Sequence, residues 1–298
     1  MANTFIHEPQ LIAELAAKLT GKDFNLAGLI STDAAADFAE GGGATVRIPV
    51  PGAVPTRTRA IGDKTTALVV DELAEKYIDV TLTDHLYNVV VLSEGDLSLD
   101  IKSYASQVLG PQTRAVAARI EALTAAAMSA TPADETITYD ASNPARAFTA
   151  ARRVLRLNGV PDSATIKAAV GANVYGDLLD AVAIENGKVR DIEVIESTRL
   201  AADDIVVFIP EAFTLVARAP RVPQGAAYGA SIKTPIVDKE RGAQFACRVV
   251  GDYDSTVAAD RSLISCFVKV AAMPLPVDRE NGTVDLVEHG GVVRIAGE

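Results

Sequence analysis

Residues 41–85, GGGATVRIPVPGAVPTRTRAIGDKTTALVVDELAEKYIDVTLTDH, hold the pattern that decides the fold. Apolar and polar residues alternate in residues 45–48 and again in residues 78–83, as they do in half-exposed strands. Between them, residues 49–67 hold three prolines, two glycines and three basic residues, which is typical of an extended polar excursion. The pattern predicts a hairpin whose long tip protrudes from the rest of the chain.

Such a hairpin leaves apolar side chains without an obvious partner in their own chain, so we expect it to contact another subunit. The side chains expected to make this contact come from the tip and from the returning strand: Arg57, Arg59, Lys64, Ile78, Val80 and Leu82. The preceding Gly41-Gly42-Gly43 lacks the Lys-Ser/Thr pair and the helix of a phosphate-binding loop. We therefore expect a turn there, at the root of the hairpin.

Three segments place apolar residues at helical spacing: residues 8–20, 111–129 and 144–157. The middle segment has the strongest signal, because alanine fills the positions around its apolar stripe and Pro111 takes the tolerated first turn. Residues 21–40, in contrast, have weak periodicity. We expect them to bury themselves poorly and to lie along another surface.

Apolar runs rich in β-branched residues predict strands in the second half of the chain, in residues 191–198, 204–210, 213–220, 244–253 and 262–273. Asn281-Gly282 predicts one more hairpin near the end. The combination of helices with several strands predicts an α+β fold.

The 298 residues suffice for one large domain or two modest ones, with 49% hydrophobic and 22% charged residues. The formal net charge is −11, whereas a protein that grips nucleic acid through its phosphates presents a basic face. A protein that encloses DNA without holding it is not excluded. No apolar stretch approaches the roughly 20 residues that span a bilayer, and the start MANTFIHEPQ lacks signal-peptide features. We therefore expect no membrane contact and a cytoplasmic site of synthesis.

Residues that could carry chemistry are scattered. His7, His85 and His289 lie far apart and match no metal-ligand spacing. Cys247 and Cys266 sit in apolar, strand-like runs, where buried thiols are expected rather than a disulfide or a metal pair. We expect no catalytic, cofactor or metal site, and hence no enzyme.

Four arginines form the single basic concentration: Arg146, Arg152, Arg153 and Arg156. Arg152 and Arg156 are four residues apart and share one face of the predicted helix. Two interpretations stay open for them, a solvated helix face or a contact with a subunit, a scaffold or nucleic acid.

Four stretches together resemble one family. They are Gly-Gly-Ala-Thr-Val-Arg-Ile-Pro at 42–49, the Pro-containing helix start at 104–121, the Pro-rich stretch at 212–229, and Asp-Tyr-Asp at 252–254 followed by Asp-Arg-Ser at 260–262. Their order and spacing resemble the major capsid proteins of tailed phages, which share the Hong Kong 97-type fold, and in particular coat proteins of actinobacterial phages.

The resemblance implies named parts. Residues 1–40 would be an N-terminal arm and residues 41–85 the extended loop that reaches over a neighbour. Residues 86–145 and 230–275 would form a peripheral domain with a spine helix at about 111–129. Residues 146–229 would form an axial domain, and residues 276–298 a C-terminal extension.

The resemblance also implies a function. The chain would assemble with itself, as hexamers and pentamers, into an icosahedral shell that encloses double-stranded phage DNA without reading its sequence. Scaffolding, portal and decoration proteins would be further partners. The protein would be assembled in the host bacterial cytoplasm and end in the virion capsid.

Three alternatives remain at this point. An encapsulin-like nanocompartment shell with the same fold would enclose cargo enzymes instead of DNA, and neighbouring genes would distinguish it from a phage coat. An uncharacterised enzyme lacks a catalytic constellation in the sequence. A different virion component, such as a tail protein, should lack the long alanine-rich helix.

Overall fold

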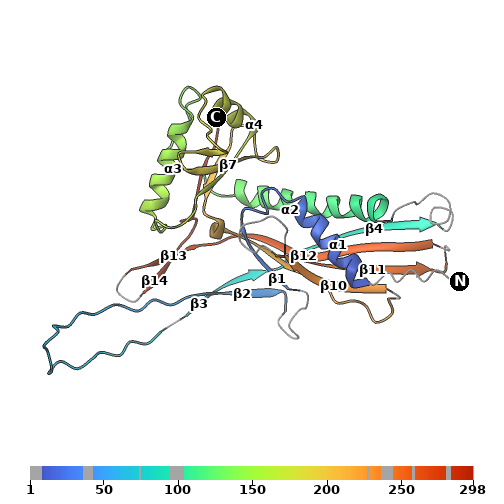
Figure 1. The fold of residues 1–298 in the computed structure, drawn as a ribbon, viewed down its shortest axis with the longest axis horizontal. Coiled ribbons are helices and arrows are strands. Elements are labelled where there is room, and N and C mark those ends of the chain that lie inside the picture. Colours follow the sequence, from blue (N-terminus) through green and yellow to red (C-terminus); the bar gives the residue numbers. More distant parts are fainter. Residues whose placement is uncertain are drawn as a thin grey trace.

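The computed structural model describes residues 9–35, 43–73, 75–93, 104–226, 228–235, 244–256, 259–279 and 283–297. These residues form two β-sheets, two separate two-stranded hairpins and four α-helices (Figure 1). The helices are α1 (Pro9–Lys22), α2 (Gly110–Ser129), α3 (Ala145–Leu157) and α4 (Ala172–Asp180), and a π-helical turn, Ala105–Leu109, leads into α2. The α+β class is confirmed, and the three expected helices are present.

The large sheet has six strands: β1 (Ser31–Ala35), β4 (Asp84–Ser93), β9 (Phe213–Arg218), β10 (Tyr228–Pro235), β11 (Gln244–Asp254) and β12 (Ala259–Ala272). Strand β12 is its axis. Strand β4 pairs with one edge of β12, and β11 and then β9 pair along the other edge, all antiparallel. Strand β1 extends the sheet beyond β9 by parallel pairing, and β10 extends it beyond β11.

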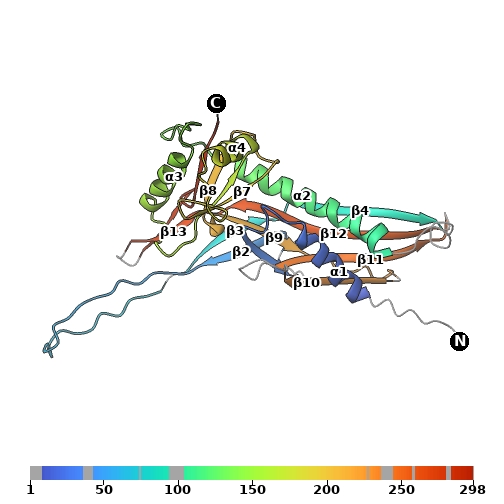
Figure 2. The same cartoon turned by 45° about the horizontal axis from the view of Figure 1, so that its top comes forward.

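Helices α1 and α2 pack on the same face of the large sheet (Figure 2). Val116, Ile120 and Met128 of α2 are buried in this layer. Helix α1 uses the small side chains of Ala13 and Ala17, both fully buried, and it therefore approaches β10 and β11 closely. Small apolar side chains thus build this part of the core, as the abundance of alanine allows.

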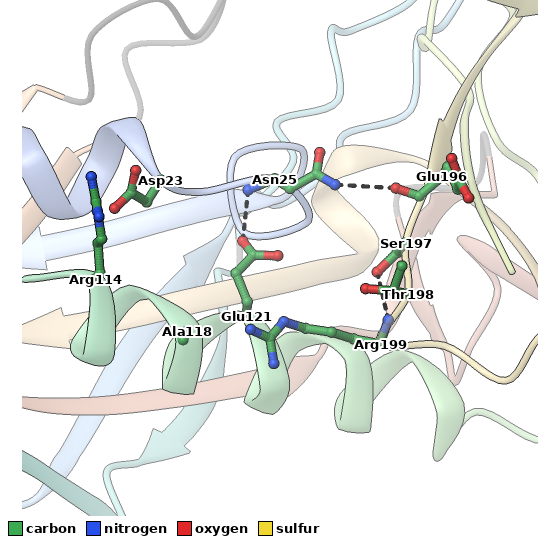
Figure 3. A pocket seen from close by; sticks show the side chains of 9 residues that line it. All are labelled: Asp23, Asn25, Arg114, Ala118, Glu121, Glu196, Ser197, Thr198 and Arg199. Atoms are coloured by element: carbon green, nitrogen blue, oxygen red, sulfur yellow. Dashed lines mark hydrogen bonds between the residues drawn. The ribbon is translucent and has the colours of Figure 1, made fainter. Parts of the chain in front are cut away.

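The apolar side chains of residues 24–30, which follow α1, are mostly buried, and this corrects the expectation for that part of residues 21–40. Leu26 and Ala27 have no exposed surface. The carboxylate of Glu121 in α2, itself buried, accepts hydrogen bonds from the backbone N–H groups of Asn25, Leu26 and Ala27 at 2.8, 2.9 and 2.9 Å (Figure 3). The backbone N–H groups of this turn are paired by a side chain far away in the sequence. The local sequence therefore has no periodic pattern that would predict the burial of the turn.

The small sheet has the order β15-β8-β5-β7-β6, from β5 (Lys167–Val170), β6 (Lys188–Val189), β7 (Ile192–Glu196), β8 (Ile205–Phe208) and β15 (Val292–Ile295). Helix α3 packs against β8 and β15. All four residues of β8 are buried, as expected for a strand in the middle of a covered sheet.

The last residues of the chain hold both parts together. Strands β13 (Leu275–Asp278) and β14 (Val284–Val287) form the expected hairpin, although its Asn281-Gly282 turn lies outside the described residues. Strand β15 then adds to the edge of β8. Nε and Nη2 of Arg294 donate hydrogen bonds to the buried carboxylate of Asp204, and the shortest of these bonds is 3.0 Å.

The two sheets divide the chain at other places than the expected domain boundaries. Strand β9, within residues 146–229, belongs to the large sheet, and β15, within residues 276–298, belongs to the small sheet. Pairing between strands far apart in sequence sets this division, and no local pattern reports it. The chain passes from the small sheet to the large sheet between β8 and β9. The assignment of peripheral and axial domains stays a proposal.

Replacing Glu121 by Gln tests the anchoring of the turn. The amide would point a donor at backbone donors, so we expect the free energy of unfolding to fall by about 2–3 kcal/mol. Chemical denaturation of the subunit measures it. The matched control is Glu135→Gln at an exposed position, where a change within about 0.5 kcal/mol is expected. Equal effects of the two substitutions would contradict the anchor.

Candidate assembly surfaces

Residues 43–81 form the expected hairpin, with a paired root and a long unpaired tip. Strands β2 (Thr45–Val50) and β3 (Lys76–Thr81) are antiparallel, and their register places Val50 opposite Lys76. The residues between them project far from both sheets (Figures 1 and 2). Of the expected glycine turn, Gly43 is described, and its φ of +64° is a backbone conformation that favours glycine.

The root of the hairpin is seated on its own chain. Val80 and Leu82 are buried in a cluster with Val216 of β9 and Met273, which follows β12, and Ile78 packs against it partly buried. The expectation that these apolar side chains lack a partner in their own chain is therefore corrected for Val80 and Leu82. Their contact with another subunit stays a prediction that nothing in this packing requires.

A second contact holds the root from the side. The ammonium group of Lys76 donates a hydrogen bond to the carbonyl of Val284 in β14. The hairpin root therefore rests on the sheet through its apolar face and on the C-terminal hairpin through Lys76. These two contacts within the chain hold the hairpin root in place.

The loop between β2 and β3 carries exposed apolar side chains that the sequence pattern did not single out: Val54, Ile61, Leu68, Val69, Val70 and Leu73. The signal was the run Ala67-Leu68-Val69-Val70 inside an otherwise polar excursion. Large apolar side chains exposed on a projecting segment make this loop a candidate interaction surface.

The expected contact residues Arg57 and Arg59 face across the loop. Arg57 Nη2 lies 2.6 Å from Asp71 Oδ1, and Arg59 Nη1 donates to the carbonyl oxygen of Thr66 at 2.7 Å. Lys64 is exposed beside them. Hydrogen bonds from Thr66 and Thr65 hold the pKa of Asp63 well below its usual range.

Strand β4 presents a second exposed row. Tyr87, Val89 and Val91 are exposed on it, whereas Leu92 is buried. The row lies on the face opposite α2, because the alternate residue Val90 pairs with Ser262, whose hydroxyl donates to Gln112 of α2 at 2.9 Å. Because β4 is an edge strand, this exposed row is a candidate surface for contact with another chain.

His85 begins this row and stacks against aromatic neighbours. Its ring lies 4.7 Å from that of Phe267 and 5.7 Å from that of Tyr87, measured between centroids. Partial burial, and then the charge of Arg248, lower the pKa of His85. The ring therefore serves as a largely neutral part of an apolar surface at neutral pH.

The buried thiols are confirmed. Cys247 and Cys266 are free and have no exposed surface, and burial raises the pKa of Cys247 to about 12 and that of Cys266 still further. The described residues contain no cluster of three or more His, Cys, Asp or Glu side chains that could hold a metal ion. His7 lies outside them.

A groove between α2, the turn after α1 and the end of β7 is drawn in Figure 3. It is lined by Arg114 and Glu121 of α2, by Asn25, and by Glu196 and Arg199 at the end of β7. Asn25 Nδ2 donates to the carbonyl of Glu196 at 3.1 Å. The groove thus lies where the turn after α1, helix α2 and the small sheet meet.

The arginines of α3 are used within the chain at two positions. Arg152 donates to the carbonyl of Arg190, and Arg156 donates to the carbonyls of Val160 and Pro161 beyond the helix end. Arg146 and Arg153 are exposed. The solvated face accounts for these two, and a partner for them stays a prediction.

No protein-family model matches the sequence, and no curated protein matches it. Solved structures do match the fold. The capsid of cyanophage P-SCSP1u has a TM-score of 0.54 at 12% identity, over 91% of this chain and 86% of that one. A virus-like particle from Pyrococcus furiosus has a TM-score of 0.54 at 10% identity, over 96% and 98%. A structure from Mycobacterium phage Che8 has a TM-score of 0.51 at 13% identity, over 85% and 84%.

These matches span nearly the whole chain, and at such low identities they establish the fold. The chain has the Hong Kong 97-type fold of tailed-phage capsid proteins, as the resemblance in the sequence implied. In the described part of the chain, no helix combines the length and the apolar character needed to cross a membrane.

Two substitutions test whether the root of the hairpin is packed in the core while its tip is not. Val80→Ala should lower the free energy of unfolding of the isolated subunit by about 1–3 kcal/mol, because it opens a cavity in the cluster under the hairpin. Ile61→Ser should leave that value within about 0.5 kcal/mol, because Ile61 is fully exposed. Urea denaturation measures both, and a neutral Val80→Ala would contradict the seating.

Proposed function

We propose that this protein is the coat subunit of a tailed phage, and that its copies assemble as hexamers and pentamers into an icosahedral shell enclosing double-stranded DNA. One observation carries the proposal. A chain with the capsid-protein fold projects a loop whose apolar tip lies outside its own core. That arrangement has a use only when a second copy covers the tip.

The reach of the loop supports a contact with a neighbour. From Val50 to Ile61 the chain advances eleven residues, which span at most about 40 Å when extended. A segment of that length extends well past the edge of its own subunit. Repetition of one modest contact around a closed shell gives a stable assembly, because symmetry makes every subunit both donor and acceptor.

The charge supports enclosure without gripping. With a net charge of −11, the subunit has no excess of cations to neutralise phosphates. DNA inside such a shell would be confined rather than bound. We further propose a peripheral domain in 86–145 and 230–275, an axial domain in 146–229 near the capsomer centres, assembly in the bacterial cytoplasm, and scaffolding, portal and decoration proteins as partners.

A second candidate is an encapsulin-like shell that encloses cargo enzymes. It is favoured by the match to a virus-like particle from Pyrococcus furiosus, which spans nearly all of both chains. The contents of particles purified from the native source distinguish the two, since DNase-protected DNA supports the phage coat and protein cargo supports the nanocompartment.

Removing the loop without disturbing its root tests the coat function. Residues 51–75 are replaced by Asn-Gly, which suits a two-residue hairpin between the paired Val50 and Lys76. We expect a folded subunit that no longer forms stable shells. Circular dichroism and thermal melting report folding, and negative-stain electron microscopy reports shells.

The control is the unaltered chain, expressed alone or with its scaffold under the same conditions. Normal particles from the shortened chain would sink the assignment of the loop. Absence of particles from the unaltered chain would count against the coat function itself.

A further inference from the structure

The tip of the extended loop, residues 57–71, is closed by side chains rather than by a strand ladder. Two bonds cross it. Arg57 pairs with Asp71 at 2.6 Å, and Arg59 donates to the carbonyl of Thr66 at 2.7 Å. Together they join the two arms at successive levels, with the Arg57–Asp71 pair nearest the root.

The end of the tip is closed by a compact turn. The Asp63 N–H donates to the carbonyl of Ala60 at 3.0 Å. Asp63 Oδ1 then accepts from the N–H and the hydroxyl of Thr65 and from the N–H of Thr66, at 2.8, 2.9 and 3.1 Å. These polar groups of the tip therefore bond to one another, while Ile61 and the run Leu68–Val70 stay exposed.

The Arg57–Asp71 pair lies on the surface but is less exposed than the ion pair at the root of the hairpin. The side chains of Arg57 and Asp71 are 47% and 27% exposed, whereas those of Arg47 and Asp79, paired at 3.3 Å across the root, are 74% and 55% exposed. A shorter and better shielded ion pair is less screened by salt. The backbone at Arg47 and Asp79 is already ordered by the β2–β3 pairing, so an ion pair between these side chains adds little further order.

Order in the tip matters for assembly, because a flexible loop loses conformational freedom when it docks. A loop that is already closed loses less. The effect is small for one subunit, but each subunit of a shell contributes one loop, so the whole assembly depends on it.

We infer that Arg57 and Asp71 are positioning residues that preset the tip for docking on a second copy of the chain, rather than contact residues in their own right. This inference rests on the proposed coat function. It changes the role expected for Arg57, from contacting the neighbour to shaping the segment that does.

Charge reversal and its compensation test the pair. Arg57→Asp brings two carboxylates together, and Asp71→Arg brings two guanidinium groups together. Each should raise the protein concentration needed for shell formation about three- to tenfold, measured by light scattering and electron microscopy. The double variant Arg57→Asp/Asp71→Arg should restore assembly to near the unaltered level. The matched control, the same exchange at Arg47 and Asp79, should change assembly less than about twofold at every stage.

A second readout is independent of shells. Thermolysin cleaves before large apolar residues, and the exposed Ile61 and Leu68–Val70 are present in every variant. Unassembled subunits with either single reversal should be cut faster in the tip, and the double variant should recover resistance. Melting temperatures should stay unchanged throughout, because the pair lies outside the core.

The outcomes are distinct. Single variants that assemble and resist proteolysis like the unaltered chain would overturn the inference. So would a double variant as impaired as the singles, because Arg57 would then act on a neighbour by itself. If no chain forms shells but cleavage follows the expected pattern, the coat function fails while the internal pair stands.

Discussion

Backbone pairing along both edges of β12 is the constraint on which the other elements depend. This fourteen-residue strand bonds β4 along one edge and β11 and β9 along the other. Buried backbone groups must be paired, so a strand this long commits three separate segments to one sheet. Helix α2 is then tied across it, because Gln112 both donates to the carbonyl of Ser262 and accepts from its hydroxyl, each at 2.9 Å.

The direction of the projecting hairpin is set by its packing on that sheet. The seat under Val80 and Leu82 is made by Val216 within β9 and by Met273, directly after β12. The loop thus consists of a seated root, two connecting arms and a tip closed on itself. Such a segment reaches away from its subunit with little freedom to collapse onto it, which is what a shell-forming contact between copies needs.

Local patterns predicted the helices well, because the helical spacing of apolar residues can be recognised within a few turns. The stripe in residues 111–129 became α2, and residues 144–157 became α3. The alternation around Ile48 and Ile78 predicted the root strands in the correct pairing. The burial of the apolar residues within 24–30 was missed, because the carboxylate that pairs their backbone belongs to Glu121, more than ninety residues away in the chain. The internal pairing of Arg57 was missed for a similar reason, since two charges fourteen residues apart in a loop have no fixed separation.

The sequence by itself determined the class of fold, the long helix and the protruding hairpin, because each follows from periodicity or composition over a short stretch, and its composition set the net negative charge. Only the tertiary structure decided which apolar residues of the hairpin are covered by the same chain, which remain exposed at the tip, and that the last strand joins β8. Those outcomes depend on pairing and packing between segments far apart in the chain, where many arrangements satisfy the same local pattern.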